Sequence, residues 1–145
     1  MALAAKLRRA PVRLATGAYI VNSGIGKLSA DEGTAAYLHG TAATAFPIIK
    51  RIDPKLFGTA LGAMEIGVGA ALLLPVVPAG LAGLALLGLG GALTALYVRT
   101  PAWHDRYLRP TPEGLGYAKD VWLAGAGAGL LIDAALTESP ITATE

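Results

Sequence analysis

The feature that most restricts the fold of this chain is the separation of its charged residues from long apolar stretches. Charged residues make up 15% of the sequence and hydrophobic residues 54%, whereas a soluble domain carries about 25% charged residues. The charges gather in the N-terminal arm, two loops and the tail. They leave uncharged or nearly uncharged stretches of about 20 residues, the length of helix that crosses a bilayer. We therefore expect an integral membrane protein.

Four membrane spans are expected, and they predict one all-α membrane domain over residues 1–145, folded as a four-helix bundle. Their approximate ranges are 12–28, 54–74, 78–98 and 113–135. Asp53 and Pro54 form a start signal for the second span, because Asp caps free N–H groups and proline needs no donor at the first helical position. Thr111, Pro112 and Glu113 give a similar signal for the fourth span. The basic N-terminus resembles a signal peptide, but we expect a retained first helix.

The connections predict two further features. Pro75 and Pro78 are too close together for one helix to pass through both, so the second and third spans should form a tight antiparallel hairpin. In the first long loop, Ser29 and Glu32 have the spacing of a capping box, and the residues that follow predict a short extra helix before Pro47. We expect this helix to lie along the membrane surface or to fold back over the mouth of the bundle.

Glycine spacing indicates how the spans pack. Gly58 with Gly62, and Gly125 with Gly129, have the small-xxx-small spacing that lets helix backbones approach closely. They predict a tight bundle, although glycine is also frequent in membrane helices whatever their role.

Aromatic and basic residues indicate the position of the chain in the bilayer. Amphipathic rings favour the headgroup level, and the rings expected there are Tyr97, Trp103 and Tyr107. A count of basic residues places the two long loops in the cytoplasm, whereas the dense N-terminal cluster places the termini there. Because the first helix usually dominates, we expect cytoplasmic termini.

Glu65 is the only charged residue in the apolar run from Leu56 to Leu74. A carboxylate at bilayer depth costs about 3 kcal/mol or more unless it is paired or protonated, so it indicates a functional site. Alternatively, it locks its helix to a neighbour through a buried Lys. The other polar residues expected in the same half of the membrane are Asn22, Ser23, Lys27, Lys119 and Asp120. We predict that all six form a polar pocket open toward the two long loops, although both Lys residues could instead be interfacial anchors.

Composition excludes several kinds of chemistry. The chain has no cysteine, which excludes disulfides, thiolate metal sites and thiol catalysis by this chain alone. His39 and His104 are the two histidines; they could lie near the pocket rim, but a lone loop His is usually solvated. A net charge of +2 is too small to indicate nucleic acid binding. We expect no catalytic residues, no metal site and no intrinsic cofactor, with a quinone or a lipid as the candidate ligands.

Three stretches together resemble the DoxX family of small bacterial membrane proteins. They are Asn22 to Leu28, then Glu65 with Gly67, Gly69 and Leu72 to Leu74, and finally Lys119 to Leu123. The resemblance covers the chain from about Arg13 to Asp133. It implies a four-helix bundle in the bacterial cytoplasmic membrane, and the residues that match the family's polar positions are Ser23, Gly24, Lys27, Glu65 and Lys119.

The family takes its name from a subunit of a thiosulfate:quinone oxidoreductase, and other members are associated with thiol and oxidative-stress complexes. Sulfur chemistry does not transfer to a chain without cysteine. The function we favour is therefore a non-catalytic accessory or anchoring subunit of a larger membrane complex. The alternatives are a quinone-linked or thiol-stress oxidoreductase component and a small transporter or lipid-binding protein. The expected partners are the lipid bilayer and other membrane proteins or further copies of the chain.

Overall fold

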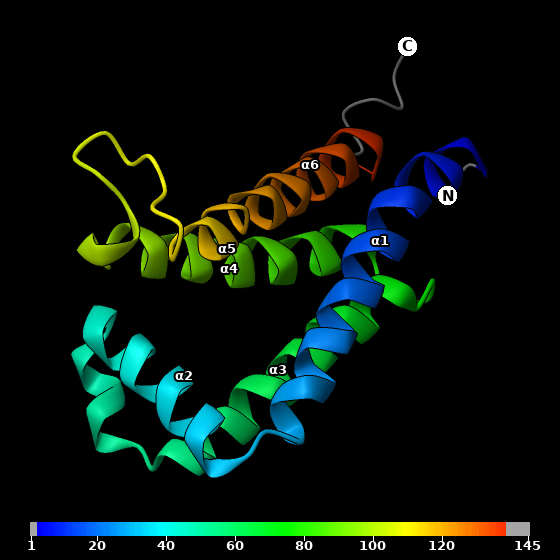
Figure 1. The fold of residues 1–145 in the computed structure, drawn as a ribbon. Coiled ribbons are helices and arrows are strands. Elements are labelled where there is room, and N and C mark those ends of the chain that lie inside the picture. The colour runs from blue at the N-terminus through cyan, green and yellow to red at the C-terminus, as the bar shows by residue number, and fades with distance from the viewer. Residues whose placement is uncertain (1–2, 139–145) are drawn as a thin grey trace.

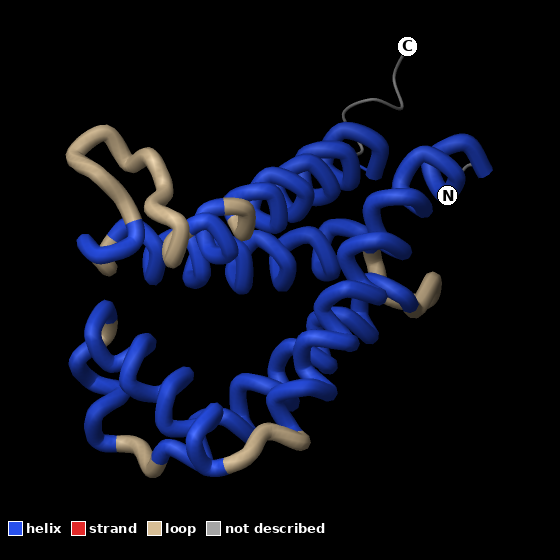
Figure 2. The backbone as a smooth tube through the Cα atoms, in the orientation of Figure 1, coloured by secondary structure: helices blue, strands red, loops and turns tan. Residues whose placement is uncertain are grey.

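The computed structural model describes residues 3–138, which consist of helices and loops (Figure 2). The long helices are α1 (Leu3–Leu28), α3 (Pro54–Leu73), α4 (Ala79–Val98) and α6 (Val121–Glu138). The short ones are α2 (Glu32–Ala45), α5 (Leu115–Ala118) and the 3₁₀ helices η1 (Pro47–Arg51) and η2 (Pro101–Trp103). The prediction of an all-α protein is confirmed.

Within the described residues, three helical segments are long and apolar enough to cross a membrane. They are Pro54–Leu73, Ala79–Val98 and Leu115–Glu138. The first two match the predicted second and third spans closely, because Asp53 caps α3 through the N–H of Leu56 at 3.0 Å and proline ends each helix. The first predicted span is not one of the three. It lies in α1, which begins earlier, at Leu3, and includes four basic residues before Leu14.

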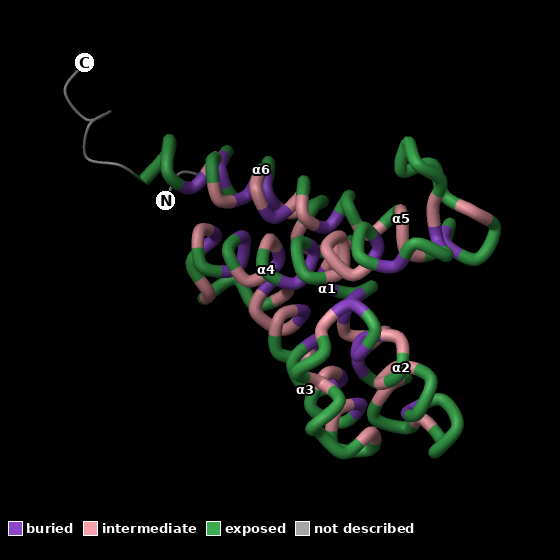
Figure 3. The backbone as a smooth tube through the Cα atoms, turned by 90° about the vertical axis from the view of Figure 1, so that its left-hand side faces the viewer, coloured by how far each residue is buried: buried purple, intermediate pink, exposed green. Residues whose placement is uncertain are grey.

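The outer surfaces of the long helices support a membrane environment. Figure 3 shows that the buried positions lie where paired helices meet, whereas positions on the other sides of the same helices are exposed. Large apolar side chains that are at least half exposed include Leu14, Leu81, Leu84, Ile132 and Leu136. Apolar surface spread over so many helical turns is unfavourable in water and fits a lipid environment.

The four long helices form two antiparallel pairs (Figure 1). α1 packs along α3, and α4 packs along α6, whereas contacts between the pairs are few. The pairs converge near the turn between α3 and α4 and diverge toward the other end, so that the outline is a V. The proline turn joins α3 to α4 as predicted, but the two helices diverge from it and each packs on a different partner, so the predicted tight hairpin is not formed. A single tight four-helix bundle is therefore not confirmed.

Glycines spaced seven residues apart explain the tightness of the α1–α3 pair. A Cβ atom on Gly24 would lie 2.6 Å from the carbonyl oxygen of Gly62, and one on Gly69 would lie 2.8 Å from that of Gly17. Because seven residues make about two turns, Gly17 and Gly24 return to one face of α1, as Gly62 and Gly69 do on α3. Only glycine permits this separation of the two backbones.

The α4–α6 pair uses the same spacing on α4. Gly83 and Gly90 face α6, and a Cβ on Gly90 or on Gly127 would lie 2.3 Å from a backbone nitrogen of the other helix. Gly125 and Gly129, the predicted packing residues of α6, have no atom of a neighbouring element within 4 Å of such a Cβ. That prediction is wrong because Gly127 lies about 200° around the helix from each of them, at 100° per residue.

The predicted extra helix is present as α2, which packs against α3. Its cap is Asp31, whose carboxylate accepts a 2.7 Å hydrogen bond from the N–H of Thr34. Ser29, the predicted cap, belongs instead to the end of α1, where its hydroxyl donates to the carbonyl of Ile25. Gly58 of α3 faces α2, so of the predicted pair Gly58 and Gly62 only Gly62 packs against α1.

N-terminal arginines hold the closed end of the V together. Arg9 is buried and forms ion pairs with Asp133 and Glu138, which joins α1 to α6. Arg13 donates hydrogen bonds to carbonyls at the end of α3 and in the turn that follows, those of Ala71, Leu72, Leu74 and Val77. It therefore satisfies carbonyls that a helix end leaves without partners.

Candidate functional site

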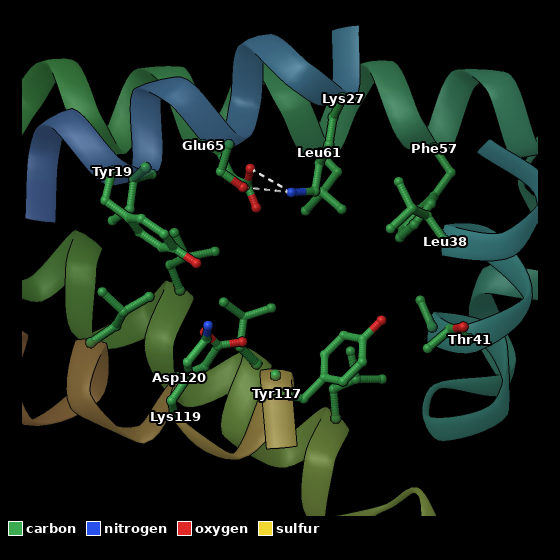
Figure 4. Close-up of a pocket in the computed structure, with 18 residues that line it drawn as sticks. Tyr19, Lys27, Leu38, Thr41, Phe57, Leu61, Glu65, Tyr117, Lys119 and Asp120 are labelled. Carbon is green, nitrogen blue, oxygen red and sulfur yellow. Dashed lines mark hydrogen bonds and ion pairs between the residues drawn. The ribbon is translucent and has the colours of Figure 1, made fainter. Parts of the chain in front are cut away.

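A cavity of about 450 Å³ lies between the two helix pairs, on the open side of the V (Figure 4). This volume falls in the range of about 300–1,000 Å³ that is typical of small-molecule sites. Its apolar walls include Leu38 of α2, Phe57 and Leu61 of α3, and Leu89, Leu93 and Leu96 of α4. The cavity combines these walls with a group of charged side chains.

Lys27 and Glu65 form an ion pair at the α1–α3 wall of this cavity. The Lys27 Nζ atom lies 2.9 Å from Glu65 Oε2 and 2.8 Å from the hydroxyl oxygen of Ser23. Glu65 is 3% exposed, and the Lys27 side chain is 19% exposed. Ser23 and Lys27 are four residues apart and therefore share one face of α1, while Gly24 lets α3 approach closely enough for Glu65 to reach them.

Lys119 and Asp120 lie on the opposite wall, at the break between α5 and α6 (Figure 4). The chain turns more tightly there, because Trp122 and Leu123 donate to the carbonyls three residues earlier. The predicted fourth span is thus interrupted, although Thr111 does act as a cap for the N–H of Gly114. In the described part of the chain, neither the Lys119 nor the Asp120 side chain has a hydrogen bond or a salt bridge.

The structure brings five of the six predicted pocket residues to one cavity. Asn22 is the exception: it is exposed and does not line the cavity. Its side chain points elsewhere because one residue turns an α-helix by about 100°. His39 and His104 do not line the cavity either, and their rings hydrogen-bond to carbonyls, His39 to Ile49 and His104 to Val98 and Asp105.

Two tyrosines in the cavity wall were missed by the sequence analysis. Tyr19 lies on α1, four residues before Ser23 and eight before Lys27, and Tyr117 belongs to α5. The helical spacing of Tyr19 from Ser23 was a signal that could have placed it on this wall. No local signal marks Tyr117, because its position depends on how the last loop folds.

The last loop is fixed by aromatic residues that were expected at the headgroup level of the bilayer. Trp103 stacks on Tyr117 with ring centroids 3.8 Å apart and planes 5° apart. The Tyr97 hydroxyl donates to the carbonyl of Leu108 at 2.9 Å. Both rings are buried against this loop, whereas Tyr107 is exposed; their depth in a bilayer stays a prediction. The Trp103 stack positions α5 and hence the break that carries Lys119 and Asp120.

Comparison of the chain with protein-family models, curated proteins and solved structures gives no match. The class of protein is therefore defined by fold and site alone. It is an all-α protein with three helical segments able to cross a membrane and a partly polar cavity between two helix pairs.

Proposed function

We propose that this protein is a multi-pass protein of the bacterial cytoplasmic membrane that binds a small amphipathic molecule, a quinone or a lipid, between its helix pairs. The observation that carries the proposal is the cavity, in which apolar walls surround the Lys27–Glu65 ion pair. Such a site can bury an apolar body and orient a polar head through a few hydrogen bonds. The resemblance to the DoxX family belongs to the same proposal, since Ser23, Lys27 and Glu65 are among its matching positions.

In this proposal the protein is a non-catalytic accessory or anchoring subunit of a larger membrane complex. Support comes from exposed side chains outside the three apolar segments. Tyr37 is 58% exposed, Ile48 64% and Tyr107 63%, and exposed aromatic and aliphatic groups of this kind are common in contacts between proteins. Purification in mild detergent should bring down stoichiometric partner proteins. A stable particle without any partner would contradict this role.

Ligand binding is tested by filling the cavity. The protein is purified in mild detergent, and the retained quinone or lipid is measured by native mass spectrometry. Leu61→Trp adds bulk to the cavity wall and should remove the retained molecule, whereas Leu81→Trp, on an exposed face of α4, should retain it. Equal retention by the two variants would overturn the proposal.

A further inference from the structure

A second hollow adjoins the cavity on the outer side of the molecule. It is a groove of about 590 Å³ between α1 and α6, with mainly apolar walls that include Val12, Ala15, Trp122 and Ala126. α1 and α6 have few contacts with one another, and the ion pairs that join them involve Arg8 and Arg9 at the closed end. Beyond these ion pairs, toward the open end of the V, the groove between the two helices is open to the outside of the molecule.

The groove and the cavity are neighbouring spaces that share part of their walls. Four residues line both of them: Tyr19, Lys119, Asp120 and Leu123. Tyr19 is 53% exposed and lines both spaces, so it lies between them. A molecule with its polar part at Lys119 and Asp120 could therefore place an apolar chain in the groove.

The depth of these charges suits a lipid headgroup. Asp120 is five residues into the apolar segment Leu115–Glu138, about 8 Å along a helix from its beginning. From there the groove runs along α6 past Trp122 to Ala126 and along α1 back toward Pro11, away from the open end of the V. An acyl chain in this direction would extend from headgroup level toward the bilayer core.

The charges of the site indicate what kind of headgroup fits. Of the ionic groups that line these two spaces, Lys27 and Glu65 already pair with each other, whereas the Lys119 ammonium and the Asp120 carboxylate have no salt bridge within residues 3–138. A headgroup with a net negative charge would leave Asp120 unpaired beside it, and a cationic headgroup would do the same to Lys119. A zwitterion supplies a phosphate for the lysine and an ammonium for the aspartate, and both would be charge-assisted hydrogen bonds.

We propose that the site binds a zwitterionic phospholipid of the phosphatidylethanolamine type. Its phosphate lies at Lys119, its primary ammonium at Asp120, and one acyl chain occupies the groove beside Trp122. This inference rests on the proposed function, of which it names the ligand class.

The test uses purified, delipidated full-length protein and native mass spectrometry with added phosphatidylethanolamine or phosphatidylglycerol of matched chains. We expect the protein to retain the ethanolamine lipid about tenfold better, as one charge-assisted hydrogen bond predicts. Asp120→Asn should abolish that preference, whereas Glu113→Gln, which changes an exposed carboxylate just before α5, should preserve it. An equal or greater retention of phosphatidylglycerol by the unaltered protein would overturn the inference.

The groove is tested separately at exposed positions of α1, where the fold should tolerate change. Ala15→Trp fills the groove and should reduce retention of the ethanolamine lipid about tenfold, whereas Ala18→Trp, outside the groove, should not. Equal retention by these two variants would exclude the groove as the chain site. If the protein binds a quinone or an anionic lipid that Leu61→Trp displaces, the proposed function stands and only this inference fails. If it retains no amphipathic molecule, both fail.

Discussion

Lys27 of α1 lies 2.9 Å from Glu65 of α3, and the ion pair joins these helices beside their close contact at Gly24. Two readings of Glu65 were open from the sequence, a functional group and a lock between helices. The geometry includes elements of both, since the carboxylate has a lysine partner and also belongs to a cavity wall. The two contributions can be separated by experiment.

Breaking this ion pair should destabilise the protein more than removing it altogether. Lys27→Met leaves the buried Glu65 carboxylate without its cation and should cost about 3 kcal/mol of unfolding free energy. The double variant Lys27→Met with Glu65→Leu should recover most of that loss, because no charge is left buried. Unfolding in detergent by a denaturant series measures both, and Lys55→Met, at an exposed position, is the control. A double variant as unstable as Lys27→Met would contradict the expectation.

Alanine substitutions in α6 should distinguish the packing glycine from its neighbours. Gly127→Ala forces a Cβ against the backbone of α4 and should destabilise the protein by about 1–3 kcal/mol. Gly125→Ala and Gly129→Ala meet no neighbouring element, and they should be neutral or stabilising by up to about 1 kcal/mol, since alanine is the better helix former. Thermal unfolding of the three variants measures the order. An equal loss of stability in all three variants would contradict the contact of α4 with the Gly127 face of α6.

The local parts of this fold could be predicted from the sequence. The limits of α3 and α4 follow from Asp53 and from prolines on either side of the turn, because caps and breakers act through the backbone next to them. The end of α1 was predicted as well. Its beginning was not, because charged residues at Lys6 to Arg9 suggested an arm, whereas two of these arginines form ion pairs with α6.

The pairing of helices could not be predicted from local signals. Each long helix carries several glycines, and the four-residue spacing in α6 selected Gly125 and Gly129 although the contact is made by Gly127. The seven-residue spacing on α1, α3 and α4 was a better signal, since it maintains one face over two turns. The polar pocket was easier to predict than the pairing of the helices. Residues at similar depth in the predicted membrane spans come to one level whichever helices are neighbours. The prediction that Asn22 lines the pocket was wrong, because depth in the membrane does not determine which side of the helix a residue occupies.

Arg13 should stabilise the turn between α3 and α4 through the shape of its guanidinium group. Its three nitrogens donate to four carbonyls, two near the end of α3 and two in the turn, and only that of Leu74 also accepts a backbone N–H. Arg13→Met should therefore destabilise the protein by about 2–3 kcal/mol. Arg13→Lys should cost part of the same stability, because an ammonium keeps the charge but lacks the planar, forked shape of the guanidinium group. Thermal unfolding measures the loss, with Lys6→Met at an exposed position as the control. Full stability of Arg13→Lys would show that charge alone suffices.

The beginning of α2 should weaken in acid. The hydrogen bond from the Thr34 N–H holds the pKa of Asp31 below the ordinary value of about 3.9 for an aspartate. Because the folded pKa is depressed, this contribution to stability is fully present above the ordinary pKa and is lost as pH falls through the folded value. Amide hydrogen exchange over the first turn of α2 should therefore accelerate, relative to α4, as pH decreases below about 4.

Asp31→Asn provides the matched control for this pH dependence. Asparagine also accepts a hydrogen bond at a helix N-cap but does not titrate, so its first turn should show the same protection at every pH after correction for intrinsic exchange. Asp31→Ala should lose protection throughout, because it cannot accept the bond from Thr34. Identical pH profiles for Asp31 and the asparagine variant would mean that the carboxylate charge contributes nothing to the start of α2. The open end of the V, to which α2 contributes the wall at Leu38, would then have to depend on its packing against α3 rather than on this cap.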